Sequence, residues 1–150
     1  MPRVFPSKGR PYHHTPGWVP EGETFHVRVR SDHAQTPVLT DPALADRLLE
    51  SVGQYHATRR WWCGLFLLMP DHWHALLAFP REPGMSQTVR QWKSFQARRH
   101  GVRWQDGYFD HRIRGKEELA VKWRYIRQNP VVKGLCAQTE DSPWFVELGE

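Results

Sequence analysis

Two histidines one residue apart, His72 and His74, are the side chains of this chain best suited to hold a metal ion. On a β-strand both imidazoles would project from the same face, because side chains alternate between the two faces. A neutral imidazole nitrogen is a common metal ligand, and Asp71 is close enough in sequence to support one of the rings. Nine histidines in 150 residues also produce such pairs by chance, so the spacing alone leaves both explanations open.

Tyr125 and Asn129 form a second candidate set, because residues four apart lie on one face of a helix. A phenol can attack phosphorus and hold DNA as a phosphotyrosine ester, provided that a metal or a base helps it to lose its proton. The alternative is an ordinary surface tyrosine followed by an asparagine that ends the helix. Spacing alone does not exclude that alternative.

The histidines need a strand and the tyrosine needs a helix, and the surrounding sequence predicts both. Residues 61–69 are apolar almost throughout, a turn follows at Pro70 and Asp71, and residues 72–79 complete a buried hairpin. Residues 116–128 have apolar residues at helical spacing and should stop before Pro130, because proline disfavours helical geometry in the residue before it. The packing face predicted for this helix consists of Leu119, Trp123 and Ile126.

Two further strands are predicted, over residues 23–30 and 108–114. The first alternates cleanly, with Phe25, Val27 and Val29 on one face and His26, Arg28 and Arg30 on the other. The second interleaves basic and aromatic residues. The first pattern is typical of a strand with one face buried.

Two further helices complete the set. Residues 41–58 follow the N-cap candidates Thr40 and Asp41, and a second helix runs from a cap at Ser86 to Gly101. The packed side of the second helix is predicted to consist of Val89, Trp92 and Phe95. The order of elements indicates an α+β fold with one mainly antiparallel sheet and helices packed on it.

The domain boundaries follow from composition. Residues 1–22 are rich in proline, glycine and basic residues and are expected to form a flexible arm, so that 23–150 is a single domain with Trp144 and Phe145 in a packed tail. No apolar run is long enough to cross a membrane and no secretion signal is recognisable, which makes the cytoplasm the default location. Cys63 and Cys136 lack the spacing of a zinc site and are expected to be reduced thiols.

The charge distribution favours a polyanionic partner. The net charge is +5, and residues 84–134 carry twelve Lys and Arg against four Asp and Glu, a surplus of eight. Residues 1–83 carry nine against eight, so the surplus is confined to one segment, as expected for a face that binds nucleic acid.

Two segments read together resemble the signatures of the single-tyrosine HUH transposases of the IS200-like superfamily. They are Met-Pro-Asp-His-Trp-His-Ala-Leu-Leu at residues 69–77 and Tyr-Ile-Arg-Gln-Asn-Pro-Val-Val-Lys-Gly-Leu at 125–135. The second resembles the REP-associated tyrosine transposases in particular. The pair Trp92-Lys93, the segment 104–111 and Trp144 also resemble this branch, so the likeness extends over about residues 20–146.

The resemblance implies a ferredoxin-like or RRM-like sandwich, the fold of HUH endonucleases. It implies that His72, His74 and Asn129 hold a divalent ion, Mg²⁺ or Mn²⁺, and that Tyr125 is the catalytic nucleophile. The expected activity is metal-dependent cleavage and strand transfer of single-stranded DNA through a 5′-phosphotyrosine intermediate. The expected partner is single-stranded DNA with a hairpin, no membrane is involved, and the chain would act as a monomer or a homodimer.

Nine basic residues could contact the DNA backbone, with nearby aromatic rings stacking on bases. They are Arg90, Lys93, Arg98, Arg99, Arg103, Arg112, Arg114, Arg124 and Arg127. Two alternatives stay open at this point. One is a non-catalytic RRM-like module that binds nucleic acid without metal, and the other is a domesticated transposase relative that processes chromosomal repeats without transposition.

Overall fold

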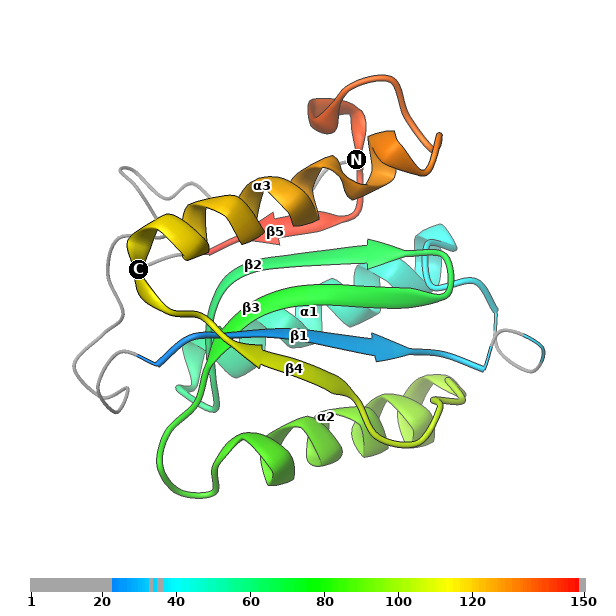
Figure 1. Cartoon of the computed structure of the whole chain (residues 1–150). Helices are drawn as coiled ribbons and strands as arrows, with labels where there is room; N and C mark the ends of the chain where they lie inside the picture. Colours follow the sequence, from blue (N-terminus) through cyan, green and yellow to red (C-terminus); the bar gives the residue numbers. More distant parts are fainter. Residues whose placement is uncertain (1–22, 33, 35–36, 149–150) are drawn as a thin grey trace.

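The computed structural model describes residues 23–32, 34 and 37–148. The arm expected over residues 1–22 lies outside the described residues. The described part forms an α+β fold, as predicted, with one sheet and helices on both of its faces (Figure 1).

Five antiparallel strands make up the sheet, in the spatial order β4-β1-β3-β2-β5. Their bounds are Phe25–Arg30 (β1), Trp62–Met69 (β2), His72–Ala78 (β3), Phe109–Arg112 (β4) and Phe145–Glu147 (β5). The predicted hairpin is confirmed as β2 and β3, with the turn at Pro70 and Asp71. Because β3 lies at the centre, its side chains are enclosed by neighbours on either side.

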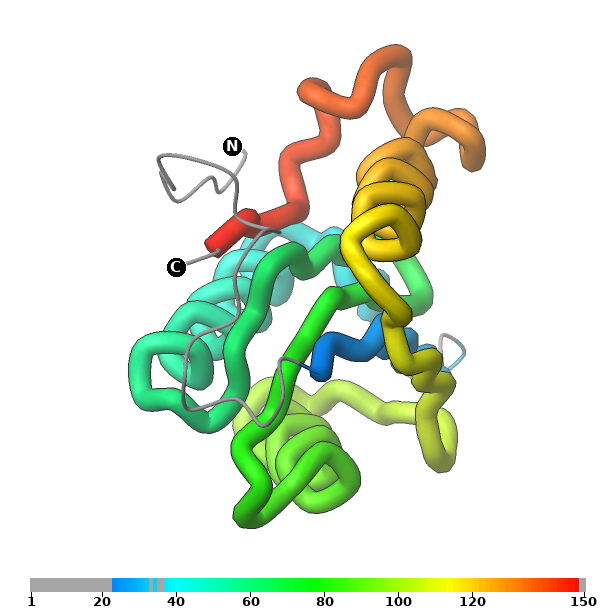
Figure 2. The backbone as a smooth tube through the Cα atoms, turned by 60° about the vertical axis from the view of Figure 1, so that its left-hand side comes forward, coloured from blue at the N-terminus to red at the C-terminus, as the bar shows by residue number. Residues whose placement is uncertain are grey.

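Three helices cover the sheet. Their bounds are Pro42–Ala57 (α1), Met85–His100 (α2) and Gly115–Val132 (α3), and a 3-10 turn spans Thr139–Asp141 (η2). One face of the sheet packs on α1 and α2 around three indoles, Trp61, Trp73 and Trp92. The other face packs on α3 through Ile126, Leu119 and Trp123, which confirms the packing face predicted for this helix. Figure 2 shows α3 on the side of the sheet away from α1 and α2.

Two details of α2 differ from the prediction. Its N-cap is Gly84, not Ser86, because Gly84 adopts a φ of +89° and its carbonyl accepts hydrogen bonds from the backbone and hydroxyl of Thr88. Phe95, predicted to pack, is 42% exposed. Gln96 is buried in its place, where its side-chain amide donates to the hydroxyl of Ser51 on α1.

The predicted end of the tyrosine helix was also wrong, because α3 continues through Pro130 to Val132. A proline inside a helix removes one backbone hydrogen bond, and here the following turn is closed by Lys133 N–H donating to the Asn129 carbonyl and Leu135 N–H to the Pro130 carbonyl. The ring of Pro130 is buried. Asn129 is therefore held in a regular helical turn, not at a frayed end.

The tail is packed, as predicted, but part of it is a strand. Phe145 opens β5, which pairs with β2, and its ring is buried against the α3 face of the sheet. Arg127 of α3 stacks on that ring with its guanidinium carbon 3.8 Å from the centroid, and it pairs with Glu147 at 3.3 Å. The tail thereby holds α3 against the sheet.

Gly64 sets how closely α3 approaches β2, which leads to a first prediction. A Cβ at this position would lie 3.1 Å from Cζ3 of Trp123 and 3.2 Å from Cη2 of Trp62. We expect Gly64→Val to push Trp123 outward and to lower the free energy of unfolding by about 1–3 kcal/mol, the usual cost of overpacking. Urea unfolding followed by tryptophan fluorescence measures this change.

The matched control is Gly53→Ala inside α1, where nothing lies within 4 Å of the added Cβ. It should raise the free energy of unfolding by about 0.5–1 kcal/mol, because alanine loses less backbone entropy than glycine in a helix. A Gly64→Val protein as stable as the parent would show that the approach of α3 does not depend on this position.

Candidate active site

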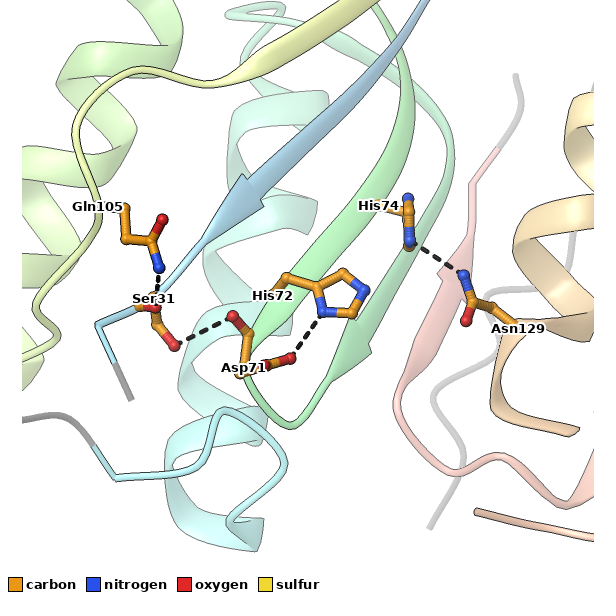
Figure 3. Close-up of polar contacts among 6 residues, drawn as sticks. All are labelled: Ser31, Asp71, His72, His74, Gln105 and Asn129. Carbon is orange, nitrogen blue, oxygen red and sulfur yellow. Dashed lines mark hydrogen bonds and ion pairs between the residues drawn. The ribbon is translucent and has the colours of Figure 1, made fainter. Parts of the chain in front are cut away.

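His72 and His74 project from the same face of β3, as their spacing predicted, with ring centroids 4.9 Å apart. This is the face on which α3 lies. The Nδ1 atom of His72 is 2.8 Å from a carboxylate oxygen of Asp71 (Figure 3). Such a contact holds a ring with Nδ1 protonated and directs the lone pair of Nε2 outward, the arrangement found around metal-binding histidines.

His74 is fixed from two sides. Its Nε2 atom lies 3.1 Å from the amide nitrogen of Asn129, and its Nδ1 atom lies 3.0 Å from Nε2 of His26. Figure 3 shows the amide of Asn129 directed at the His74 ring from α3. Asn129 is only 6% exposed, and its side-chain oxygen Oδ1 is buried without a hydrogen-bond partner.

Tyr125 lies one turn before Asn129 on α3 and is close to the histidines. Its ring centroid is 6.0 Å from that of His74, with the two rings nearly perpendicular. The residue is 52% exposed, so its hydroxyl is accessible to a ligand from solvent. The structure thus brings together the four residues predicted as metal ligands and nucleophile, from β3 and from α3.

His26 is a neighbour of this set that the sequence analysis did not single out. It comes from β1, is 4% exposed, and lies against His74 and Tyr125, at a ring-centroid distance of 6.3 Å from the latter. The alternation of residues 25–30 placed His26 on the polar face of its strand. This alternation would have identified His26 as a site residue if the pairing of β1 with β3 had been known.

Burial keeps these imidazoles neutral. Desolvation lowers the pKa of His26 to about 4, with further lowering by the charge of Lys122. Desolvation also lowers the pKa of His74, to about 2, and the electrostatic effect of His72 is the second largest cause of this lowering. The pKa of His72 is lowered by desolvation too, although the bond to Asp71 opposes this. A neutral ring keeps the lone pair that a metal needs.

Two imidazoles and one side-chain amide are the groups that could hold a divalent ion here. No cluster of three or more His, Cys, Asp or Glu side chains that could hold a metal occurs among the described residues, so the two histidines require Asn129 as a third ligand. Rotating the side-chain amide of Asn129 by half a turn would exchange its two ends, so that the unpartnered oxygen would lie beside His74 in place of the nitrogen. Two lone-pair donors would then face each other, an arrangement that a cation between them stabilises. The three side chains therefore fit a metal ion.

The nine basic residues predicted to contact DNA do not lie on one face. Four are on α2, on the side of the sheet away from Tyr125, namely Arg90, Lys93, Arg98 and Arg99. Arg103 follows in the next loop and lines a pocket of about 690 Å³ with Arg90 and Lys93. Arg114 and Arg124 are exposed, the first immediately before α3 and the second on it.

Several of the nine have structural partners. Arg127 is bound to Glu147, Phe145 and the Thr139 carbonyl, and its side chain is only 14% exposed. Arg112 pairs with Glu23 at 3.3 Å. Arg127 therefore has a packing role, and its contact with DNA stays a prediction.

The ammonium group of Lys93 also has protein partners, because it donates to two backbone carbonyls, of Gln105 at 3.0 Å and of Gly107 at 2.8 Å.

Two arginines that were not predicted to contact DNA lie closer to the candidate active site. Arg28 and Arg30 pair across strands with His74 and His72 and so share their face of the sheet.

Comparison with known proteins places the chain among transposases. The profile of the family described as "Transposase IS200 like" matches residues 25–129. One solved structure, described as the REP-associated tyrosine transposase bound to a REP hairpin, is similar in fold with a TM-score of 0.72, at 21% identity over 88% of this chain and 81% of that chain. A Deinococcus radiodurans R1 protein, provisionally described as a transposase, gives a TM-score of 0.52 at 18% identity, covering 81% of this chain and 96% of that chain.

At these identities the two structures show likeness of fold alone. No curated protein matches this sequence. Within residues 23–32, 34 and 37–148, no helix is both long enough and apolar enough to cross a membrane.

Proposed function

Because the chain belongs to the IS200-like transposase family, we propose that it is a metal-dependent endonuclease and strand transferase that acts on single-stranded DNA through Tyr125. The observation that carries this proposal is the convergence of an exposed phenol with two neutral imidazoles and a buried, unpartnered amide oxygen. Each of these groups has a role in cleaving a phosphodiester.

The phenol oxygen of Tyr125 attacks the scissile phosphorus and the bond from phosphorus to the 3′ oxygen breaks. The products are a 5′-phosphotyrosine and a free 3′-hydroxyl. His72, His74 and Asn129 would hold the divalent ion, which, when bound, polarises the phosphate and neutralises its charge. Asp71 orients His72 by accepting a hydrogen bond from its ring, and His26 contacts His74 from the other side.

The reverse reaction rejoins strands without a nucleotide cofactor. A 3′-hydroxyl attacks the phosphotyrosine, the bond from phosphorus to the Tyr125 oxygen breaks, and the phenol is released. The phosphotyrosine ester retains the free energy of the original phosphodiester, so nicking and transfer use the same groups.

The proposed substrate is single-stranded DNA with an imperfect hairpin, since the REP hairpin is what the similar structure is described as binding. The proposed ion is Mg²⁺ or Mn²⁺, and the two nitrogen ligands favour Mn²⁺ in vitro. Exposed arginines on the tyrosine side of the sheet, such as Arg124, would contact the DNA backbone.

A denaturing gel tests the proposal. The protein is incubated with hairpin DNA labelled on the 3′ side of the cleavage region and with Mn²⁺, and we expect a labelled band at the mass of protein plus DNA. EDTA should prevent its formation. Hairpin binding without any such band would favour a non-catalytic nucleic-acid-binding module instead.

The salt dependence of DNA binding gives a second prediction. Affinity for the hairpin should fall by about tenfold or more between roughly 50 and 200 mM KCl, because each phosphate contact releases a bound counterion. Arg124→Ala should reduce the slope of affinity against salt. Arg47→Ala on α1, an exposed arginine on the opposite side of the sheet, is the control and should leave the slope unchanged. Equal affinity at both salt concentrations would contradict contact with the DNA backbone.

A further inference from the structure

A second hollow lies beside the candidate active site, on the half of the sheet formed by β1 and β4. Its volume is about 350 Å³, and it is lined by Arg28 and Arg30 of β1 and by residues 105–109. None of the groups proposed to hold the metal or to attack the phosphate lines it. The sequence analysis predicted no role for either arginine.

The wall opposite the arginines is held in place. Lys93 of α2 donates to the carbonyls of Gln105 and Gly107 and so ties residues 105–107 to the helix. Gln105 N–H donates to the Arg30 carbonyl at 2.9 Å, and the indole of Trp104 donates to the Lys93 carbonyl. The loop wall of the hollow is therefore held in position, and a ligand would not have to order the loop.

The lining combines three chemical groups. Phe109 presents an aromatic ring that is 42% exposed, with the guanidinium carbon of Arg28 5.0 Å from its centroid. Arg28 and Arg30 supply positive charge on the β1 side. Asp106 supplies a carboxylate on the loop side. An aromatic surface beside guanidinium groups is the combination that binds a base and its phosphate.

Strand pairing places this hollow next to the histidines. Arg28 is the cross-strand partner of His74, and Arg30 that of His72, and directly opposed residues of antiparallel strands lie on one face about 5 Å apart. Phe109 in turn pairs with Arg28, so the ring is one strand further from β3. Arg28 thus lies between His74 and Phe109 in the sheet.

We propose that this hollow binds one unpaired nucleotide of the DNA next to the scissile phosphate, with its base stacked on Phe109 and its phosphate bound by Arg28 and Arg30. The proposal rests on the proposed function, because it takes the scissile phosphate to lie at His72 and His74. The nucleotide positions the strand along β1, which aligns the neighbouring phosphate with Tyr125.

The polar groups of the loop predict a base preference. The carboxylate of Asp106 only accepts hydrogen bonds, and one of the two side-chain N–H groups of Gln105 is already donated to the Ser31 carbonyl. The loop side of the hollow therefore offers a carboxylate acceptor to the edge of the base. Cytosine, adenine and guanine, which carry an exocyclic amino group, should be preferred to thymine, whose single ring N–H is flanked by two carbonyl oxygens.

Affinity measurements on single-base deletions test the proposal. The probe is an imperfect DNA hairpin with six unpaired nucleotides, cytosines and adenines, on each side, and Tyr125→Phe protein is used so that only binding is measured. Each unpaired nucleotide is made abasic in turn. We expect Phe109→Ala to weaken binding of the intact probe by about tenfold, the usual effect of losing one stacked base. It should have no further effect on one abasic probe, the one that lacks the stacked base.

Phe95→Ala is the matched control, because Phe95 is an equally exposed aromatic ring on α2, on the other side of the sheet. It should bind every probe like the parent. The proposal is overturned if Phe109→Ala also binds every probe like the parent, or if its loss of affinity is the same for all abasic probes. Thermal unfolding of both variants shows whether they are folded.

This result is separable from the cleavage reaction. Suppose that the Phe109→Ala protein forms the covalent adduct as well as the parent at saturating DNA and that its affinity for DNA is unchanged. The chemistry proposed for Tyr125 would then stand, and the hollow would not be a nucleotide site. Suppose instead that Phe109→Ala loses affinity in the base-specific way but the parent protein forms no covalent adduct. The nucleotide site would then stand, and the proposed chemistry would be wrong.

Discussion

Tyr125→Phe is expected to abolish the covalent protein–DNA adduct, a loss of at least about a thousandfold, while affinity for hairpin DNA stays within about twofold of the parent. The substitution removes only the attacking oxygen. The ring that lies beside His26 and His74 remains, and because the residue is half exposed its hydroxyl contributes little to packing. The denaturing gel measures the adduct, and fluorescence anisotropy measures the affinity.

Tyr55 provides the control for this variant. It is a buried tyrosine of α1, in the core on the side of the sheet away from Tyr125, so Tyr55→Phe should form the adduct as the parent does. An undiminished adduct in Tyr125→Phe would show that another group attacks the phosphate. The role assigned to the phenol would then be wrong, although the resemblance of fold would stand.

His72→Ala is expected to remove metal binding. Changing a group that only supports a metal ligand costs roughly 10- to 100-fold in affinity, so deletion of the ligand itself should exceed about a hundredfold. Titration calorimetry with Mn²⁺ measures this directly. Mn²⁺ should also raise the melting temperature of the parent and not that of the variant, because a ligand stabilises only the protein that binds it.

Two further variants complete the series. Asp71→Asn keeps His72 but weakens the acceptor at its Nδ1 atom, 2.8 Å away, and should lie between the parent and His72→Ala. His100→Ala removes a histidine at the end of α2, away from β3, and should bind Mn²⁺ like the parent. Equal Mn²⁺ affinity in all four proteins would contradict a metal site at the histidine pair.

Much of the fold was predictable because the periodicity of apolar residues along the chain indicates where strands and helices form. The strand at residues 25–30 and the apolar hairpin around Asp71 appear where alternation and turn residues predicted them. The α2 cap was missed because a glycine with positive φ replaced the side-chain cap that Ser86 suggested. The end of α3 was missed because tertiary packing around Pro130 offsets the loss of one hydrogen bond.

The chain of amino acids was sufficient to place His72 with His74 on one strand face and Tyr125 with Asn129 on one helix face, because both relations depend only on the repeat of a local structure. Their meeting could not be derived in this way. His74 and Asn129 are 55 residues apart, and their contact depends on how closely α3 packs against the sheet, which the missing side chain of Gly64 permits.

The same distinction applies to the groups that surround the site. Alternation predicted one strand face for His26, Arg28 and Arg30. Only the pairing of β1 with β3 places that face beside His72 and His74. Conversely, the charge of Arg127 suggested a DNA contact, whereas packing of the tail bound it to Glu147. Periodicity is a property of neighbours along the chain, and distances between strands and helices arise only when their side chains pack together.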